Sequence, residues 1–146
     1  MSERTVLQSL SRGHVLSLGP QASVRDAACA MTRANCGSVL IIDGAGPMVG
    51  ILTERDLMTR VLAKGLDADA TTVTQVMTRN PRCVAPETKV ADAVVIMMER
   101  GFRHLPVVGE GGRVLGVFSV RDALPREVNT AVDLAEFNEQ VNDALG

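Results

Sequence analysis

Two short stretches of the sequence place a hydroxyl, an arginine and an aspartate at the same spacing. Residues 50–57 read GILTERDL, and 66 residues later residues 116–123 read GVFSVRDA. In each stretch a glycine precedes the hydroxyl residue by three positions and an aspartate follows it by three. A hydroxyl and a carboxylate at this spacing form a capping box at the start of a helix. Such a start also offers unpaired N–H groups and a positive dipole end, which attract phosphate.

These residue types suit the sugar and phosphate of a nucleotide. A carboxylate beside a helix start can accept hydrogen bonds from ribose hydroxyls, as in dinucleotide-binding folds. The glycine would let a ligand approach the backbone closely, because it has no side chain. The alternative explanation is helix capping alone, and capping and binding are compatible. The predicted ligand-binding residues of the two stretches are Thr53, Arg55, Asp56, Ser119, Arg121 and Asp122.

The two stretches belong to a longer internal repeat. A shift of 66 residues aligns residues 15–57 with residues 81–123 without a gap, which implies duplication of one supersecondary unit. The identical pairs include Pro20/Pro86, Val24/Val90, Asp26/Asp92, Ala27/Ala93, Met31/Met97, Gly46/Gly112, Gly50/Gly116, Arg55/Arg121 and Asp56/Asp122.

Each repeat is expected to fold in the order β-α-β-β-α. Apolar periodicity predicts a strand at 15–18, a helix from 24 capped by Ser23 and Asp26, strands at 38–42 and 48–52, and a helix from Thr53. The second repeat predicts strands at 82–85, 105–108 and 114–118, and helices from 90 and from Ser119. The glycines of GAGPMVG (44–50) join two strands, so they predict a hairpin turn rather than a dinucleotide fingerprint.

The predicted fold class is α/β (α+β), with two pseudo-symmetric units packed sheet to sheet as one globule. Neither unit alone is long enough to bury much surface, which favours packing of the two together. We expect an N-terminal segment at 1–14, a first unit at 15–66, a connector at 67–80, a second unit at 81–125 and a C-terminal helix at 126–146.

Composition excludes several classes of function. The net charge is −2 without a basic block, and the chain has no Trp or Tyr, so nucleic acid is not an expected partner. No apolar run reaches the roughly 20 residues of a membrane span, so we expect no membrane partner and a cytoplasmic location. The three cysteines lack metal-site spacing, and Cys29 is expected to be a buried thiol on a helix. No metal site and no catalytic residue is predicted.

The sequence resembles a tandem pair of CBS (cystathionine-β-synthase) domains, the arrangement called a Bateman module. The resemblance rests on the two turns 50–56 and 116–122, on VMTRNP (76–81) and on RHLPVV (103–108), and it covers about residues 15–124. It implies a regulatory, energy-sensing module that binds AMP, ADP, ATP or S-adenosylmethionine in clefts between the units, with no obligatory cofactor. It also implies a homodimer, formed through helices, and a signal to an unknown, separate effector protein. Met58, Leu62, Met97 and Met98 are candidate interface residues, and core packing explains them equally well.

By position, the resemblance adds further ligand contacts. Arg103 and His104 would approach phosphate, Ser38 would belong to the ligand site of the first unit, and Val84 would pack against adenine. The alternative for Arg103 is a surface charge, and the alternative for His104 is a structural hydrogen bond. The first unit has Ser38 where the second has His104 and lacks the basic residues, so unequal sites are expected. Two alternatives stay open: a scaffold that dimerises without ligand and, more remotely, an enzyme that uses Cys83 and His104. We expect the chain not to be an enzyme.

Overall fold

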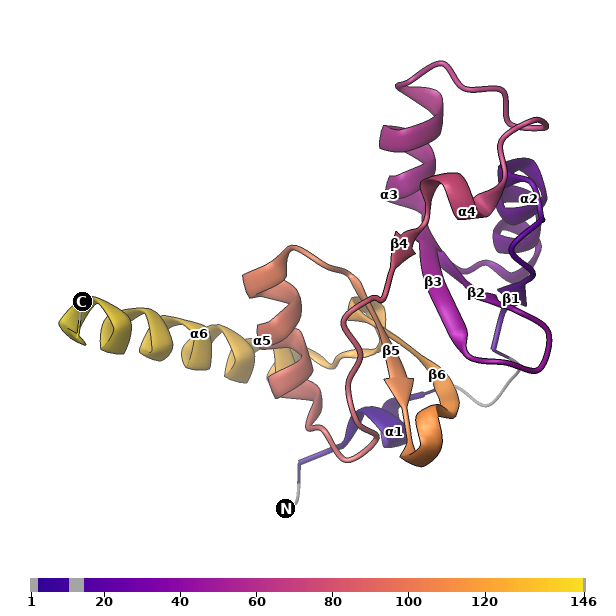
Figure 1. Cartoon of the computed structure of the whole chain (residues 1–146). Helices are drawn as coiled ribbons and strands as arrows, with labels where there is room; N and C mark the ends of the chain where they lie inside the picture. The colour runs from indigo at the N-terminus through magenta and orange to yellow at the C-terminus, as the bar shows by residue number, and fades with distance from the viewer. Residues whose placement is uncertain (1–2, 11–14, 146) are drawn as a thin grey trace. The chain divides into compact units, whose positions relative to one another are not determined.

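The computed structural model describes residues 3–10 and 15–145 (Figure 1). The chain divides into two compact units. The first unit is His14–Pro81, and the second combines Met1–Gly13 with Arg82–Gly146. Each unit has its own sheet and its own hydrophobic core, and the predicted α/β fold with two sheets is confirmed.

The first unit is built on a four-stranded sheet of order β1-β2-β3-β4. Its elements are β1 (Ser17–Leu18), α2 (Val24–Ala34), β2 (Ser38–Ile42), β3 (Met48–Thr53), α3 (Glu54–Asp56) with the π-helical continuation η1 (Leu57–Leu62), α4 (Val73–Val76) and β4 (Thr78–Arg79). Strands β2 and β3 form the predicted antiparallel hairpin, and Gly44 in its loop has a positive φ of 60°. Ser23 and Asp26 cap α2 reciprocally, as predicted.

The second unit repeats this plan with a smaller sheet. Its elements are α1 (Val6–Ser9), α5 (Val90–Arg100), β5 (His104–Val108), η2 (Glu110–Gly112), β6 (Val114–Ser119), η3 (Val120–Asp122) and α6 (Pro125–Leu145). Strands β5 and β6 pair antiparallel, and Val84 forms a parallel bridge with Val107 on the other side of β5. That bridge matches the pairing of Leu18 with Ile41 in the first unit.

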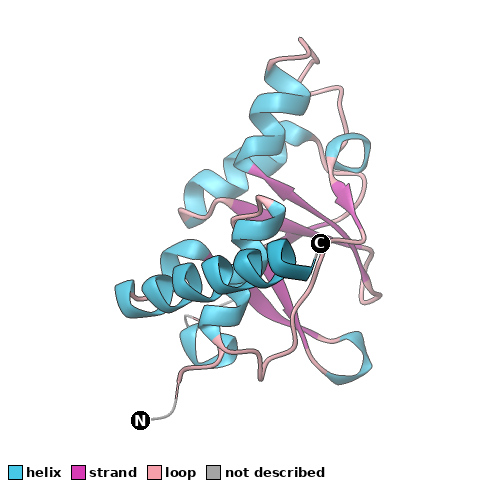
Figure 2. Cartoon of the chain, turned by 90° about the vertical axis from the view of Figure 1, so that its left-hand side faces the viewer, coloured by secondary structure: helices cyan, strands magenta, loops and turns pink. Residues whose placement is uncertain are grey.

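The end of the second repeat differs from the prediction. The helix expected from Ser119 is a single 3-10 turn, η3, and the chain returns to an extended conformation at Ala123. The physical reason is Pro125, because the residue before a proline disfavours the helical region while proline suits the first helical position. Helix α6 therefore starts afresh at Pro125, runs 21 residues and continues past α5 (Figures 1 and 2).

Two short segments that we predicted to lie outside the repeats are part of the compact units. The expected connector, 67–80, contributes α4 and β4 to the first unit, and the N-terminal segment contributes α1 to the second. Thr72 bridges Ser23 beside α2, and Thr5 bridges Lys89 beside α5. Each segment thus packs against the start of the unit's first long helix.

None of the described helices has the length and apolar character needed to span a bilayer.

Candidate ligand-binding site

In each unit the hydroxyl that starts the aspartate turn pairs across the sheet with a polar residue. Thr53 at the end of β3 lies opposite Ser38 on β2, and Ser119 at the end of β6 lies opposite His104 on β5. The backbone repeats the match beyond the pairs: Glu54 N donates to Gly37 O at 3.0 Å, while Val120 N donates to Arg103 O at 3.1 Å. The hairpins therefore bring Ser38 and Thr53 together at one end of the first sheet, and His104 and Ser119 together at the matching end of the second.

Each aspartate carboxylate closes its own turn. Asp56 Oδ2 accepts from Thr53 N at 3.0 Å, and Thr53 Oγ1 accepts from Asp56 N at 3.2 Å. Asp122 Oδ2 accepts from Ser119 N at 2.9 Å, and Ser119 Oγ accepts from Arg121 N at 3.3 Å. The capping explanation is thus realised in both units. It uses Oδ2 of each carboxylate and leaves Oδ1 outside the capping hydrogen bonds.

The surroundings of the two carboxylates differ. Asp56 is 8% exposed and its Oδ1 lies 3.6 Å from Arg60 Nε, whereas Asp122 is half-buried. Arg60 also donates through Nη1 to the carbonyls of Val76 and Met77, at 3.0 and 3.2 Å. A cation therefore already lies beside the carboxylate of the first unit.

The glycine of each turn has a structural role that the sequence interpretation missed. A Cβ on Gly50 would lie 2.5 Å from Met77 Sδ and 2.8 Å from Thr78 O, and a Cβ on Gly116 would lie 2.8 Å from Leu10 Cδ1. Both glycines thus admit close packing by the chain itself, and the expectation that they also admit a ligand stays a prediction.

The remaining predicted residues lie at different depths. The side chains of Arg55, Arg103 and Arg121 are exposed, and His104 is half-buried. Val84 is 6% exposed and its side chain belongs to the core of the second unit.

Sequence reasoning missed two arginines that support the turns. Arg60 supports the first turn, and Arg4 donates through Nη2 to the carbonyl of Asp122 at 3.0 Å. Arg60 could have been found, because it lies four residues after Asp56 on one helix face. Arg4 gave no such signal, since it is 118 residues away in sequence.

The thiol of Cys83, on which the enzyme alternative depends, is partly buried. Burial raises the pKa of the Cys83 thiol, which disfavours the thiolate that a nucleophile requires. Cys29 is exposed, so its predicted burial is wrong. Together with residues of η1, it lines a cavity of the first unit. Within residues 3–10 and 15–145, no three His, Cys, Asp or Glu side chains are grouped to hold a metal ion.

A cavity of about 540 Å³ lies on the helical side of the first unit, and no predicted site residue lines it. Its lining comes from α2, from η1 and from the loop after η1: Val24, Arg25, Ala28, Cys29, Thr32, Arg33, Leu57, Val61, Leu62, Leu66 and Ala68. Met58 and Leu62 on η1 are 57% and 79% exposed and Met98 on α5 is 47% exposed, whereas Met97 is 3% exposed in the core.

Comparison with known proteins gives one consistent family. The CBS domain matches twice, at residues 7–63 and 73–127. An uncharacterized 17.7 kDa protein of Acidianus ambivalens is 34% identical over 81% of this chain and 70% of its own length. A CBS domain-containing protein of Arabidopsis thaliana is 35% identical over 92% of this chain, which spans only 25% of that protein.

Solved structures similar to this chain include CBS domain proteins. A CBS domain protein of Pyrobaculum aerophilum complexed with AMP is 27% identical, with a TM-score of 0.76 over 91% of this chain and 99% of that one.

Proposed function

Because the CBS domain matches its sequence twice over most of its length, this chain belongs to the CBS domain family, and we propose that it senses an adenosine-containing ligand at its aspartate turns. The observation that carries the proposal is the repeated arrangement of a cross-strand polar pair and a capped aspartate, at the same sheet end of both units. The AMP complex of the similar Pyrobaculum protein supports this choice of ligand.

The chemistry assigned to each residue follows from its place at the turn. Oδ1 of Asp56 and of Asp122, outside the capping hydrogen bonds, would accept from ribose hydroxyls. The half-buried Thr53 and Ser119 would approach ribose or phosphate. The exposed guanidinium of Arg103 and the His104 ring would contact phosphate in the second unit, because charge-assisted hydrogen bonds to phosphate are among the strongest that side chains form.

The two sites are proposed to be unequal. In the first unit Arg60 approaches Asp56, and Ser38 takes the place of His104. In the second, the carboxylate of Asp122 is half-buried and Arg103 and His104 add basic groups. The second unit should therefore bind the more highly phosphorylated ligand and bind it more tightly.

The proposed ligands are AMP, ADP, ATP or S-adenosylmethionine, and their proposed role is regulatory. A bound ligand shifts a conformational equilibrium only through its different affinity for two states, and a separate effector protein would detect that shift. This assigns energy sensing to the chain as part of the proposal.

A homodimer is part of the same proposal. The exposed Leu62 lines the apolar cavity on the helical side of the first unit, and the exposed Met58 lies on the same element, η1. A second copy of the chain would cover such a surface. A scaffold that dimerises without ligand is the competing function, and it predicts no response to nucleotides.

The deciding experiment is isothermal calorimetry of the full chain with AMP, ATP and S-adenosylmethionine, supported by thermal unfolding. A ligand at about 100 times its Kd should add about 2.7 kcal/mol to the free energy of unfolding. Asp122→Asn keeps a carbonyl oxygen that can cap the turn but loses the second acceptor, so it should weaken binding about tenfold or more. Asp56→Asn should weaken it less.

The matched control is Asp26→Asn, which alters a capping box of the same kind at the start of α2. It should change stability slightly and leave nucleotide affinity at the wild-type value. Wild-type protein that gives no heat with any of the three ligands would favour the scaffold instead.

A further inference from the structure

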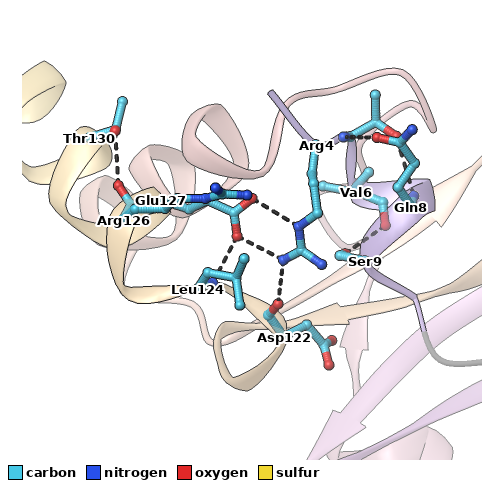
Figure 3. Close-up of polar contacts among 10 residues, drawn as sticks. Arg4, Val6, Gln8, Ser9, Asp122, Leu124, Arg126, Glu127 and Thr130 are labelled. Carbon is cyan, nitrogen blue, oxygen red and sulfur yellow. Dashed lines mark hydrogen bonds and ion pairs between the residues drawn. The ribbon is translucent and has the colours of Figure 1, made fainter. Parts of the chain in front are cut away.

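The side chain of Arg4 joins three segments of the second unit (Figure 3). Its Nε donates to Glu127 Oε2 at 3.0 Å and its Nη2 donates to Glu127 Oε1 at 2.7 Å. The same Nη2 donates to the carbonyl of Asp122 at 3.0 Å, and Glu127 Oε1 also accepts from Leu124 N at 2.7 Å. One guanidinium thus links the N-terminal segment, the aspartate turn and the first turn of α6.

Burial makes this link specific rather than a loose surface contact. Glu127 is 8% exposed, and the side chain of Arg4 is 28% exposed. The hydrogen bonds from Arg4 hold the pKa of Glu127 below its usual range, although burial alone would raise it. A bidentate arginine–carboxylate pair fixes both planes, so the guanidinium has one orientation toward Asp122.

The backbone around Arg4 is held as firmly as its side chain. Its carbonyl accepts from Val90 N at 3.0 Å, at the start of α5, and Val6 N donates to Thr88 O at 2.7 Å. Further along the same segment, Leu10 packs over Gly116 on β6. The N-terminal segment, residues 4–10, therefore contacts the second aspartate turn at two places. Leu10 packs on β6 before the turn, and Arg4 hydrogen-bonds to the Asp122 carbonyl at the end of the turn.

We propose that Arg4 is a positioning residue that couples ligand occupancy at Asp122 to the N-terminal segment and to α6. Arg4 contacts the main chain of Asp122, while the carboxylate points away from the guanidinium (Figure 3). It can therefore hold the backbone from which the carboxylate projects without occupying the carboxylate. This inference rests on the proposed function, since it concerns the regulation of the same site.

The coupling is tested with calorimetry of AMP binding to wild type, Arg4→Ala, Asp122→Asn and the double variant. Arg4→Ala should weaken AMP about tenfold, within the usual range of coupling between sites. Arg4→Lys keeps the charge but has a single donor nitrogen, so it should recover part of that loss. In the Asp122→Asn background the Arg4→Ala change should have little further effect on AMP affinity. The carboxylate that Arg4 is proposed to position is already absent from that variant.

Coupling is reciprocal, so AMP should in turn stabilise the N-terminal segment. Hydrogen exchange of the Val6 and Leu7 amides, which donate to Thr88 and Pro86 carbonyls, should slow at least about threefold with saturating AMP. The slowing should vanish in Arg4→Ala. Arg25→Ala removes an exposed arginine–aspartate pair in the first unit and is the matched control, with AMP affinity unchanged.

The outcomes separate the two proposals. Wild type that binds AMP, with Asp122→Asn weakened but Arg4→Ala unchanged, overturns the coupling and leaves the function standing. An Arg4→Ala loss that is equally large in the Asp122→Asn background shows a merely structural role and also overturns it. Wild type that binds no AMP ends both. Should Arg4→Ala lose its helical circular dichroism, Arg4→Lys and Glu127→Gln carry the same comparison.

Discussion

The two aspartate turns share one local structure but are held by arginines from different parts of the chain. The first turn is supported by Arg60, four residues later on the same helical stretch, at 3.6 Å from the Asp56 carboxylate. The second is supported by Arg4, 118 residues away in sequence, on the main-chain carbonyl of Asp122. Duplication has preserved the turn itself, while its support is local in one unit and distant in the other.

The difference has a structural origin in the ends of the repeats. After Asp56 the chain continues into η1, which carries Arg60, whereas after Asp122 it leaves the helical conformation before Pro125. The residue four positions after Asp122 is Arg126, which belongs to the new helix α6 rather than to a continuation of the turn. The N-terminal segment and Glu127 of α6 supply the contact instead.

The largest change in the free energy of unfolding is expected when a methyl group is added at the glycine of each aspartate turn. Gly50→Ala places a Cβ 2.8 Å from the backbone oxygen of Thr78, which cannot move alone, so we expect a loss of about 3 kcal/mol in the free energy of unfolding. Gly116→Ala meets only the end of the Leu10 side chain, which can rotate, so about 1 kcal/mol is expected. Urea unfolding followed by circular dichroism measures both.

A second substitution checks the cause. Leu10→Ala should make Gly116→Ala nearly neutral, because it removes the atom that the new Cβ would meet. Met77→Ala should relieve Gly50→Ala only in part, since the Thr78 carbonyl stays in place. Equal losses for the two glycine variants would show that the two turns are packed alike.

Next in size is the loss of the two supporting arginines. Arg4→Ala leaves a nearly buried Glu127 without its partner, so we expect about 2 kcal/mol, between the values for buried and surface pairs. Arg60→Ala removes a 3.6 Å contact from a side chain that is 47% exposed, so less than about 1 kcal/mol is expected. Urea unfolding at neutral pH is the measurement, and a larger loss for Arg60→Ala would reverse the ranking.

Acid should reproduce part of the Arg4 effect in the second unit. The hydrogen bonds from Arg4 lower the pKa of Glu127 in the folded protein, from an ordinary value of 4.5. The pair therefore stabilises the fold fully above pH 4.5, and this contribution is lost as the pH falls through the lower, folded pKa. Glu127→Gln should flatten the acid side of the stability–pH curve.

The control for acid is Glu136→Gln, an exposed glutamate on the same helix. It should leave the shape of the curve between pH 5 and acid unfolding as in wild type. A curve for Glu127→Gln that keeps the wild-type slope would remove Glu127 as the group responsible.

Sequence alone predicted the parts that depend on local pattern. The repeat at 66 residues, the Ser23–Asp26 cap and both hairpins follow from spacing and turn residues, and the structure has them. The cross-strand pairs of Ser38 with Thr53 and of His104 with Ser119 then follow from hairpin register. Their expected role in binding a ligand stays a prediction.

The missed features depend on contacts between distant segments. The packing of α1 on the second unit could have been found, because TVLQSL (5–10) resembles TVTQVM (72–77), and both form capping boxes through Thr and Gln. Leu10 and Met77 end these motifs, and each packs on the glycine of one turn. In this alignment Arg4 matches Thr71, so comparison of the two motifs gives no signal for the arginine that hydrogen-bonds to the Asp122 carbonyl.

The smallest expected effect concerns charge at the two proposed ligand sites. Arg103 is exposed beside the His104–Ser119 pair, whereas Gly37 holds the matching place in the first unit. Arg103→Ala should weaken ATP about fivefold and leave adenosine unchanged, because an exposed guanidinium acts on phosphate charge alone. Calorimetry in low and high salt tests this, and the ATP loss should shrink as salt screens the charge. The control is Arg113→Ala, which makes the same charge change at the other end of the β5–β6 hairpin and should alter the affinity for neither ATP nor adenosine. Equal losses of ATP and adenosine affinity in Arg103→Ala would show that Arg103 supports the fold rather than binds phosphate.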